Sequence, residues 1–147
     1  DLGELEIFGE NLYAIHSIEY TDLAEHFYVF AIRYKDVWLS WEEVEFIAAF
    51  YDFPTAPLLL EETPSSETEI KKTVIDLAVG KSLYDSVDAH TGEGCTMEGI
   101  VSRNKEEYPV ADFKQNVFKY VRANHVQTDE HWTRNWKRAP LVWEKKK

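Results

Sequence analysis

The sequence has little cysteine and no long hydrophobic run. Its single cysteine, Cys95, excludes an intrachain disulfide framework and fits a reducing compartment. No apolar stretch approaches the ~20 residues that are needed to cross a bilayer, and the N-terminus shows no basic region followed by an apolar core. We therefore expect a protein of the cytoplasm or nucleus that has no membrane partner.

Basic residues are scarce outside the C-terminal end. The sequence holds 16 Lys or Arg against 27 Asp or Glu, which gives a net charge of -11. Nine of the bases and only three of the acids fall within residues 114–147, so this segment carries +6 and the other 113 residues carry -17. A polyanion is expected to approach the basic segment, although a solvated basic tail has the same composition.

The composition fits one cored domain of ordinary size, because 44% of the 147 residues are hydrophobic and 14% are aromatic. We expect residues 1–147 to form a single domain. Expected helices and strands interleave without the regular alternation of a doubly wound sheet. The prediction is an α+β fold with largely antiparallel sheets and flanking helices.

The first forty residues have the pattern of strands. Residues 5–20 contain two apolar-rich stretches interrupted at Gly9-Glu10, which predicts a strand, a tight passage and a second strand. Residues 26–34 form a nearly continuous apolar run, and Lys35-Asp36 separates it from residues 37–39. This second pattern predicts a hairpin.

Two helices are expected after the hairpin. Ser40 and Glu43 match a capping box, and the apolar positions that follow share one helix face until Pro54: Val44, Ile47, Ala48 and Tyr51. A second apolar face within residues 70–78 predicts another helix that stops near Gly80. Further strands are expected at 55–60, 97–103 and 117–122, with a loop at 81–96.

Four segments of rarer sequence follow one another in a fixed order. They are FGENLYA at 8–14 with HSI at 16–18, FYVF at 27–30, EGIV at 98–101, and KYVR at 119–122 with HVQTDEHW at 125–132. EGIV alone is weak, since Glu-Gly before a β-branched pair occurs by chance in many proteins. The order and spacing of the segments and the long last stretch add the specificity. Together they resemble the ATP-dependent RNA ligases, a branch of the covalent nucleotidyltransferases, over about residues 7–132.

The resemblance implies a reaction and a partial nucleotidyltransferase (ligase adenylation) fold. In this family a lysine attacks the α-phosphate of ATP, the AMP passes to an RNA 5′-phosphate, and a 3′-hydroxyl seals the RNA ends. The implied cofactors are ATP and Mg²⁺ or Mn²⁺, the implied partners are RNA ends, and the implied role is RNA repair. Such chemistry depends on positioning and charge neutralisation.

Two residues match the family's nucleotide-binding positions. Glu10 stands where the family holds the ribose hydroxyls, and an acceptor-only group suits a diol. Phe30 matches the aromatic residue that stacks on adenine, with Phe27 as the second choice. Many relatives follow this aromatic with Asp, whereas this chain has Ala31. An exposed turn glutamate and a plain core aromatic are the alternatives.

Three further residues match the phosphate side of the family's site. Glu98 corresponds to the carboxylate that helps bind the divalent metal. Lys119 corresponds to the lysine on the α-phosphate, and Arg122 is placed to add a bidentate phosphate contact. A strand-terminal glutamate and a solvent-facing lysine are the alternatives. If the family roles hold, Glu10, Glu98 and Lys119 are expected to converge on one triphosphate-sized cleft.

The sequence contains no Lys-x-Asp-Gly, the motif that carries the adenylated lysine in this family. We expect a piece of a larger ligase that is incomplete at its N-terminus, inactive alone, and completed by the remainder of the protein or by another chain. The alternatives are a non-catalytic nucleotide- or RNA-binding module and a structural interaction domain. Zinc at His125, Asp129 and His131 is disfavoured, because zinc sites use closer-spaced ligand pairs.

Overall fold

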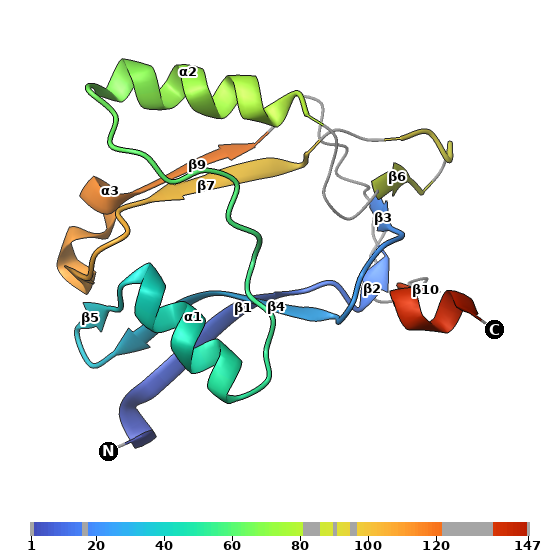
Figure 1. Cartoon of the computed structure of the whole chain (residues 1–147), viewed down its shortest axis with the longest axis horizontal. Coiled ribbons are helices and arrows are strands. Elements are labelled where there is room, and N and C mark those ends of the chain that lie inside the picture. The colour runs from blue at the N-terminus through green and yellow to red at the C-terminus, as the bar shows by residue number, and fades with distance from the viewer. Residues whose placement is uncertain are drawn as a thin grey trace. The chain divides into compact units, whose positions relative to one another are not determined.

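The structure is a computed structural model that describes residues 2–15, 18–80, 86–89, 91–94, 97–121 and 137–146 (Figure 1). The chain divides into two compact units. Unit 1 comprises residues 1–11, 27–57 and 101–118, and unit 2 comprises residues 12–26, 58–100 and 119–147. The predicted α+β class with antiparallel sheets is confirmed, and the single domain stays a prediction.

Unit 1 contains a four-stranded sheet in the order β1-β4-β5-β8. Its strands are β1 (Leu5–Asn11), β4 (Phe27–Tyr34), β5 (Val37–Trp38) and β8 (Tyr108–Pro109), and the paired strands are antiparallel. Unit 1 also holds the helices α1 (Trp41–Phe50) and α3 (Phe113–Asn116), with short 3-10 turns at Leu2–Glu4 and Val110–Asp112.

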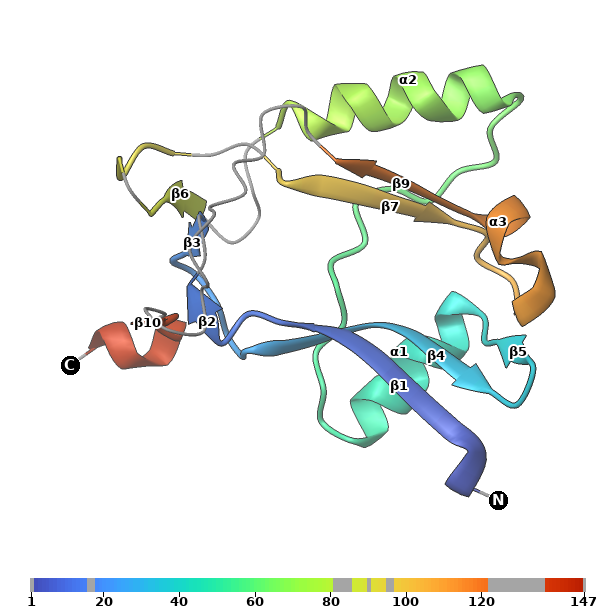
Figure 2. The same cartoon turned by 180° about the vertical axis from the view of Figure 1, so that it is seen from behind.

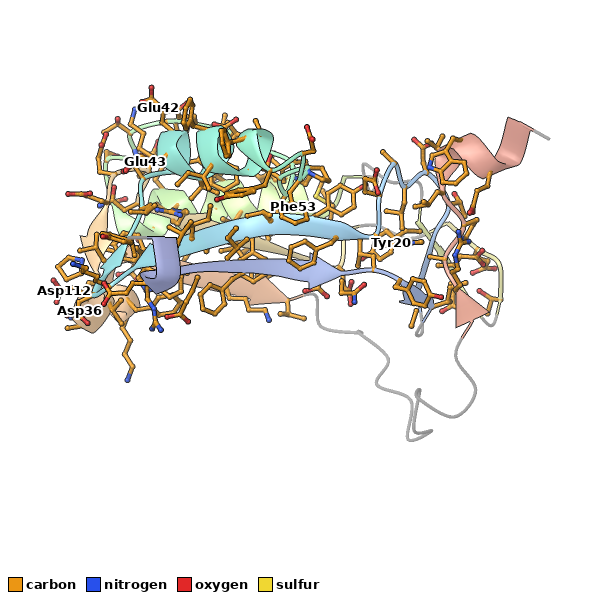
Figure 3. All side chains as sticks on the ribbon, turned by 90° about the horizontal axis from the view of Figure 1, so that it is seen from below. Tyr20, Asp36, Glu42, Glu43, Phe53 and Asp112 are labelled. Carbon is orange, nitrogen blue, oxygen red and sulfur yellow. The ribbon has the colours of Figure 1, made fainter. Side chains whose placement is uncertain are left out.

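The core of unit 1 lies between β4 and α1. Val29, Ile32, Leu39, Val44 and Ala48 form its buried cluster. The helix starts as its sequence predicts, because the Ser40 hydroxyl accepts from the Glu43 amide at 3.2 Å and the Glu43 carboxylate accepts from the Ser40 amide at 3.2 Å. Figure 3 labels Glu43 at this helix start.

Two predictions about α1 and the preceding hairpin have mixed outcomes. The hairpin is confirmed, and Lys35 takes the left-handed backbone conformation that its turn requires, with φ of 53°. Tyr51 was expected on the buried face of the helix, which is wrong. It caps the helix C-terminus and is 41% exposed, because the helix ends one residue before it.

Unit 2 is built from short strand pairs and one long helix. Its pairs are β2 (Ala14–Ile15) with β10 (Lys137–Arg138) and β3 (Ile18–Tyr20) with β6 (Ser86–Asp88), both antiparallel. The helix α2 (Glu67–Ala78) is capped by Ser66, whose hydroxyl accepts from the Glu69 amide at 3.1 Å. This helix confirms the second predicted helix.

The strands β7 (Gly99–Arg103) and β9 (Val117–Val121) form a further two-stranded sheet. Figure 2 shows their arrows running in opposite directions. The two strands lie within the ranges predicted for them, 97–103 and 117–122, so both predictions are confirmed. None of the helices in those residues is long and apolar enough to cross a membrane.

Three sequence predictions about local structure are wrong. β1 runs unbroken through Gly9 and Glu10, because Gly9 has no side chain and passes close to Phe27 and the Tyr28 carbonyl of β4. The strand expected at 55–60 is reduced to one bridge, Val29 to Thr55, beside the prolines at 54 and 57. The loop expected at 81–96 contains β6.

A C-terminal clasp, defined as residues 137–144, packs on residues 13–15 and 23–26 within unit 2. Leu23, Ala139 and Leu141 are at most 5% exposed. The Ala139 amide donates to the Tyr13 carbonyl at 2.7 Å, and His26 Nε2 lies 2.8 Å from the Ala139 carbonyl oxygen. The backbone of residues 137–144 is therefore part of the folded unit.

One ion pair closes this clasp. Arg138 donates two hydrogen bonds to the Glu144 carboxylate, one of them at 2.9 Å, and the Leu141 amide donates to the same carboxylate at 2.9 Å. The hydrogen bonds from Arg138 and then from Leu141 lower the pKa of Glu144 from 4.5 to about 2. The ionised form of Glu144 is therefore favoured by folding.

The clasp should weaken in acid. A carboxyl group whose folded pKa is depressed contributes stability above its unfolded pKa of 4.5, and this contribution is lost as the pH falls towards about 2. We expect the melting temperature of Glu144→Gln to lie below that of the unsubstituted protein at pH 7, with the difference narrowing from pH 5 to pH 3. Thermal unfolding monitored by circular dichroism measures this.

The matched control is Glu45→Gln, which changes an exposed carboxylate on α1 outside the clasp. Its melting temperature should follow that of the unsubstituted protein at every pH. A difference between Glu144→Gln and the unsubstituted protein that stays constant from pH 7 to pH 3 would contradict the assignment.

Candidate functional site

Glu10 and Phe30 lie on the paired strands β1 and β4 of unit 1. Glu10 is exposed and stands opposite Tyr28 in the strand register. Val29 faces the core beneath α1, so the alternation of strand side chains directs Tyr28 and Glu10 to the other face of the sheet. The Glu10 carboxylate is thus available on the surface of the sheet.

Phe30 is the extra residue of a β-bulge. Phe8 pairs with Ala31 and Gly9 pairs with Val29, so the register skips Phe30. The Phe30 ring is 43% exposed, whereas Phe27 packs on the core cluster and against Phe53, with ring centroids 5.6 Å apart. Of the two aromatics proposed for adenine stacking, Phe30 is the more accessible.

Glu98 directly precedes β7 in unit 2 and is half-buried. The Tyr20 hydroxyl donates a hydrogen bond of 2.5 Å to Glu98 Oε2. Sequence reasoning did not single out Tyr20, because 78 residues separate it from its partner and no local pattern links them. The contact fixes one oxygen of the carboxylate.

Lys119 lies in β9 and is exposed. A side chain at Gly99 would clash with the Tyr120 carbonyl oxygen, so β7 and β9 approach closely at this point. Glu98 precedes Gly99 and Lys119 precedes Tyr120 in the sequence. Because β7 and β9 run in opposite directions (Figure 2), Glu98 and Lys119 lie on opposite sides of this contact along the two strands.

The predicted site residues therefore fall into two sets. Glu10 and Phe30 belong to unit 1, and Glu98 and Lys119 belong to unit 2. Their convergence on one cleft stays a prediction. Arg122 and the segment 125–132 lie outside the described residues.

Arg103 is the one cation of β7, and its contacts are structural. Its Nη2 donates to the Leu39 carbonyl at 2.6 Å, and the guanidinium lies 5.2 Å from the centroid of the Tyr108 ring. Burial lowers the pKa of Arg103. These contacts of Arg103 lie within unit 1 and occupy its guanidinium with structural partners.

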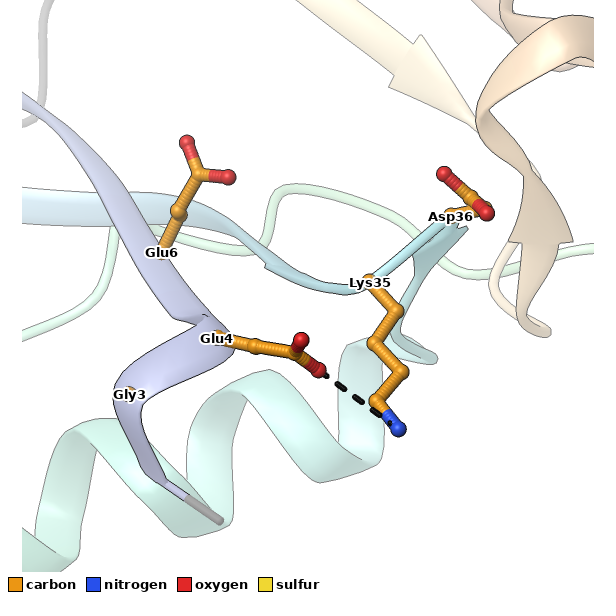
Figure 4. Close-up of a pocket in the computed structure, with 5 residues that line it drawn as sticks. All are labelled: Gly3, Glu4, Glu6, Lys35 and Asp36. Atoms are coloured by element: carbon orange, nitrogen blue, oxygen red, sulfur yellow. Dashed lines mark ion pairs between the residues drawn. The ribbon is translucent and has the colours of Figure 1, made fainter.

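An open pocket of about 510 Å³ on unit 1 is lined by charged side chains around the turn between β4 and β5 (Figure 4). Its lining residues are Gly3, Glu4, Glu6, Lys35 and Asp36. Lys35 Nζ lies 3.5 Å from Glu4 Oε2 in an ion pair. None of the predicted site residues lines this pocket.

Of the candidate metal ligands, Glu98 lies within the described residues, whereas His125, Asp129 and His131 lie outside them. Within the described ranges, no group of three or more His, Cys, Asp or Glu side chains could hold a metal ion. Zinc needs such an all-protein ligand set, whereas Mg²⁺ keeps several waters and uses one or two carboxylates together with phosphate oxygens. Glu98 offers one half-buried carboxylate of the kind that Mg²⁺ uses.

Comparison with known proteins adds one positive finding. The family model described as RNA ligase matches residues 1–121, which is most of the chain and includes β1, β4, β7 and β9. No curated protein and no solved structure matches the chain. On the strength of the family match, this chain belongs to the RNA ligase family.

Proposed function

We propose that this chain supplies the nucleotide- and metal-binding residues of an ATP-dependent RNA ligase. The enzyme joins RNA 5′-phosphate and 3′-hydroxyl ends through an enzyme–AMP and an RNA–adenylate intermediate. The observation that carries the proposal is the match of the RNA ligase family model to residues 1–121, which include Glu10, Phe30, Glu98 and Lys119.

The nucleoside is assigned to the β1–β4 pair. Glu10 accepts hydrogen bonds from the ribose hydroxyls, for which an exposed carboxylate is suited. Phe30 offers an accessible ring for stacking on adenine. Ala31 provides no carboxylate beside the ring, so any contact that relatives make through an aspartate at this position is absent here.

The phosphates are assigned to Glu98 and Lys119. Glu98 holds a divalent cation, Mg²⁺ or Mn²⁺, which neutralises phosphate charge when it is bound. Lys119 donates to the α-phosphate and stabilises the charge that grows on its oxygens during transfer. Arg122 is assigned a second phosphate contact through its forked guanidinium.

The nucleophilic lysine is assigned to a polypeptide segment outside these 147 residues. The sequence contains no Lys-x-Asp-Gly. We therefore expect the chain alone to bind nucleotide without forming a covalent adduct. Covalent chemistry requires the full-length protein that contains this sequence, or a second chain that brings the lysine.

Self-adenylation should depend on Glu98. The full-length protein incubated with radiolabelled ATP and MgCl₂ should form a covalent AMP adduct, and Glu98→Gln should slow adduct formation by about 100-fold, because the variant loses the anionic ligand for the cation. The readout is the labelled protein band after denaturing electrophoresis.

Glu45→Gln serves as the control, since it removes an exposed carboxylate on α1 and should adenylate at the unsubstituted rate. Absence of an adduct from the full-length protein would count against ligase activity. An adduct formed equally fast by Glu98→Gln would count against the role of Glu98.

ATP binding should depend on Phe30 and not on other exposed aromatics. Stacking on a base contributes roughly 1–3 kcal/mol, so Phe30→Ala should weaken ATP binding by about fivefold or more in isothermal titration calorimetry. Phe46→Ala removes a ring that is 74% exposed on α1 and should leave the affinity unchanged. Equal affinities for the two variants would exclude Phe30 as the stacking residue.

A binding module without catalysis is the second candidate function. The +6 charge of residues 114–147 and the missing motif favour it. Binding to single-stranded RNA through phosphates should weaken with salt, with a log-log slope of about -0.7 per contact. RNA binding by the full-length protein with this salt slope, but without any covalent AMP adduct, would favour the module over the ligase.

A further inference from the structure

The contact between Tyr20 and Glu98 joins two distant parts of unit 2. Tyr20 is the last residue of β3 (labelled in Figure 3), and Glu98 is the residue before β7. Both side chains are half-buried, and the hydroxyl-to-carboxylate distance is 2.5 Å. An O–H donor to a carboxylate at this distance forms a charge-assisted bond, which is stronger than one between neutral groups.

Tyr20 is held in place independently of Glu98. The strand β3 pairs with β6 through Ile18 with Asp88 and Tyr20 with Ser86. The side chain therefore projects from a paired strand rather than from a free loop, and the backbone that carries it is held independently of Glu98. A donor fixed in this way can orient a flexible partner.

A glutamate that binds a metal needs such orientation. Its side chain has three rotatable bonds, so an unrestrained carboxylate spends little time in the geometry that the ion requires. The bond from Tyr20 engages Oε2 and so restrains the orientation of the carboxylate. Carboxylates that bind metals are in turn hydrogen-bonded by neighbouring groups, and the loss of such a group lowers metal affinity.

The alternative explanation is that this hydrogen bond has only a structural role and links β3 to the start of β7. Backbone bonds already secure both neighbourhoods, since β3 pairs with β6 and the Met97 amide donates to the Gly80 carbonyl at 3.2 Å. The two explanations predict different effects when the hydrogen bond is lost. Loss of a purely structural bond lowers the stability of the fold, whereas loss of an orienting bond lowers the affinity for the ion.

We propose that Tyr20 is a positioning residue, which orients the Glu98 carboxylate for a divalent cation through the hydrogen bond to Oε2. The proposal rests on the proposed function, in which Glu98 holds Mg²⁺ or Mn²⁺. Tyr20 itself contacts neither nucleotide nor RNA in this scheme.

The test compares Tyr20→Phe, which removes only the hydroxyl, with Tyr51→Phe, which removes a hydroxyl at the C-terminus of α1. Mn²⁺ binding to the full-length protein is followed by electron paramagnetic resonance in the presence of the unreactive analogue α,β-methylene-ATP. Tyr20→Phe should weaken Mn²⁺ binding by about tenfold or more, and Tyr51→Phe should bind as the unsubstituted protein does.

Self-adenylation supplies a second readout. Tyr20→Phe should raise the Mg²⁺ concentration for half-maximal rate by a similar factor, and saturating Mg²⁺ should restore the rate to within about twofold. A lower melting temperature of Tyr20→Phe with unchanged Mn²⁺ affinity and unchanged Mg²⁺ dependence would overturn the proposal.

Glu98→Gln distinguishes a failure of the positioning role of Tyr20 from a failure of the metal-binding role of Glu98. If Glu98→Gln loses Mn²⁺ binding and Tyr20→Phe does not weaken it, the positioning role fails and the metal role of Glu98 stands. If Glu98→Gln binds Mn²⁺ as tightly as the unsubstituted protein, the metal role fails and the positioning role fails with it.

Discussion

Close backbone approach at two glycines determines where the candidate carboxylates lie. Gly9 passes close to Tyr28 in β4, and Gly99 passes close to Tyr120 in β9, at points where a Cβ atom would clash with a carbonyl oxygen. Each glycine adjoins a carboxylate, Glu10 in unit 1 and Glu98 in unit 2. The Phe-Gly-Glu and Glu-Gly-Ile patterns therefore describe a packing requirement as well as a chemical one, because any larger residue would push the paired strands apart.

Local signals explain what could be predicted from the sequence, and distant pairing explains what could not. The hairpin turn at Lys35 and the capping box at Ser40 depend on neighbours within four residues, and both were predicted. The strand β6 lacks such a signal, since it is defined by pairing with β3 some seventy residues earlier. The donor to Glu98 was missed for the same reason, whereas Glu98 itself was identified by resemblance alone.

The C-terminal clasp extends the folded unit beyond the residues that the family model matches. The match ends at residue 121, yet residues 137–144 pack on the connection between β1 and β4 and bury Leu23 and Leu141. This connection joins the strand that carries Glu10 to the strand that carries Phe30. The folded conformation of this connection therefore depends in part on residues that lie outside the match to the family model.

The charge distribution limits how such a chain can bind an anionic partner. Outside residues 114–147 the sequence carries -17, so an approaching nucleotide or RNA is repelled by most of the chain. Lys119 and Arg122 lie in the segment of opposite sign. A divalent cation beside Glu98 would convert one of the repelling carboxylates into part of an attractive site. If Glu98 holds such a cation as proposed, the hydrogen bond from Tyr20 restrains its carboxylate in an orientation that faces the ion.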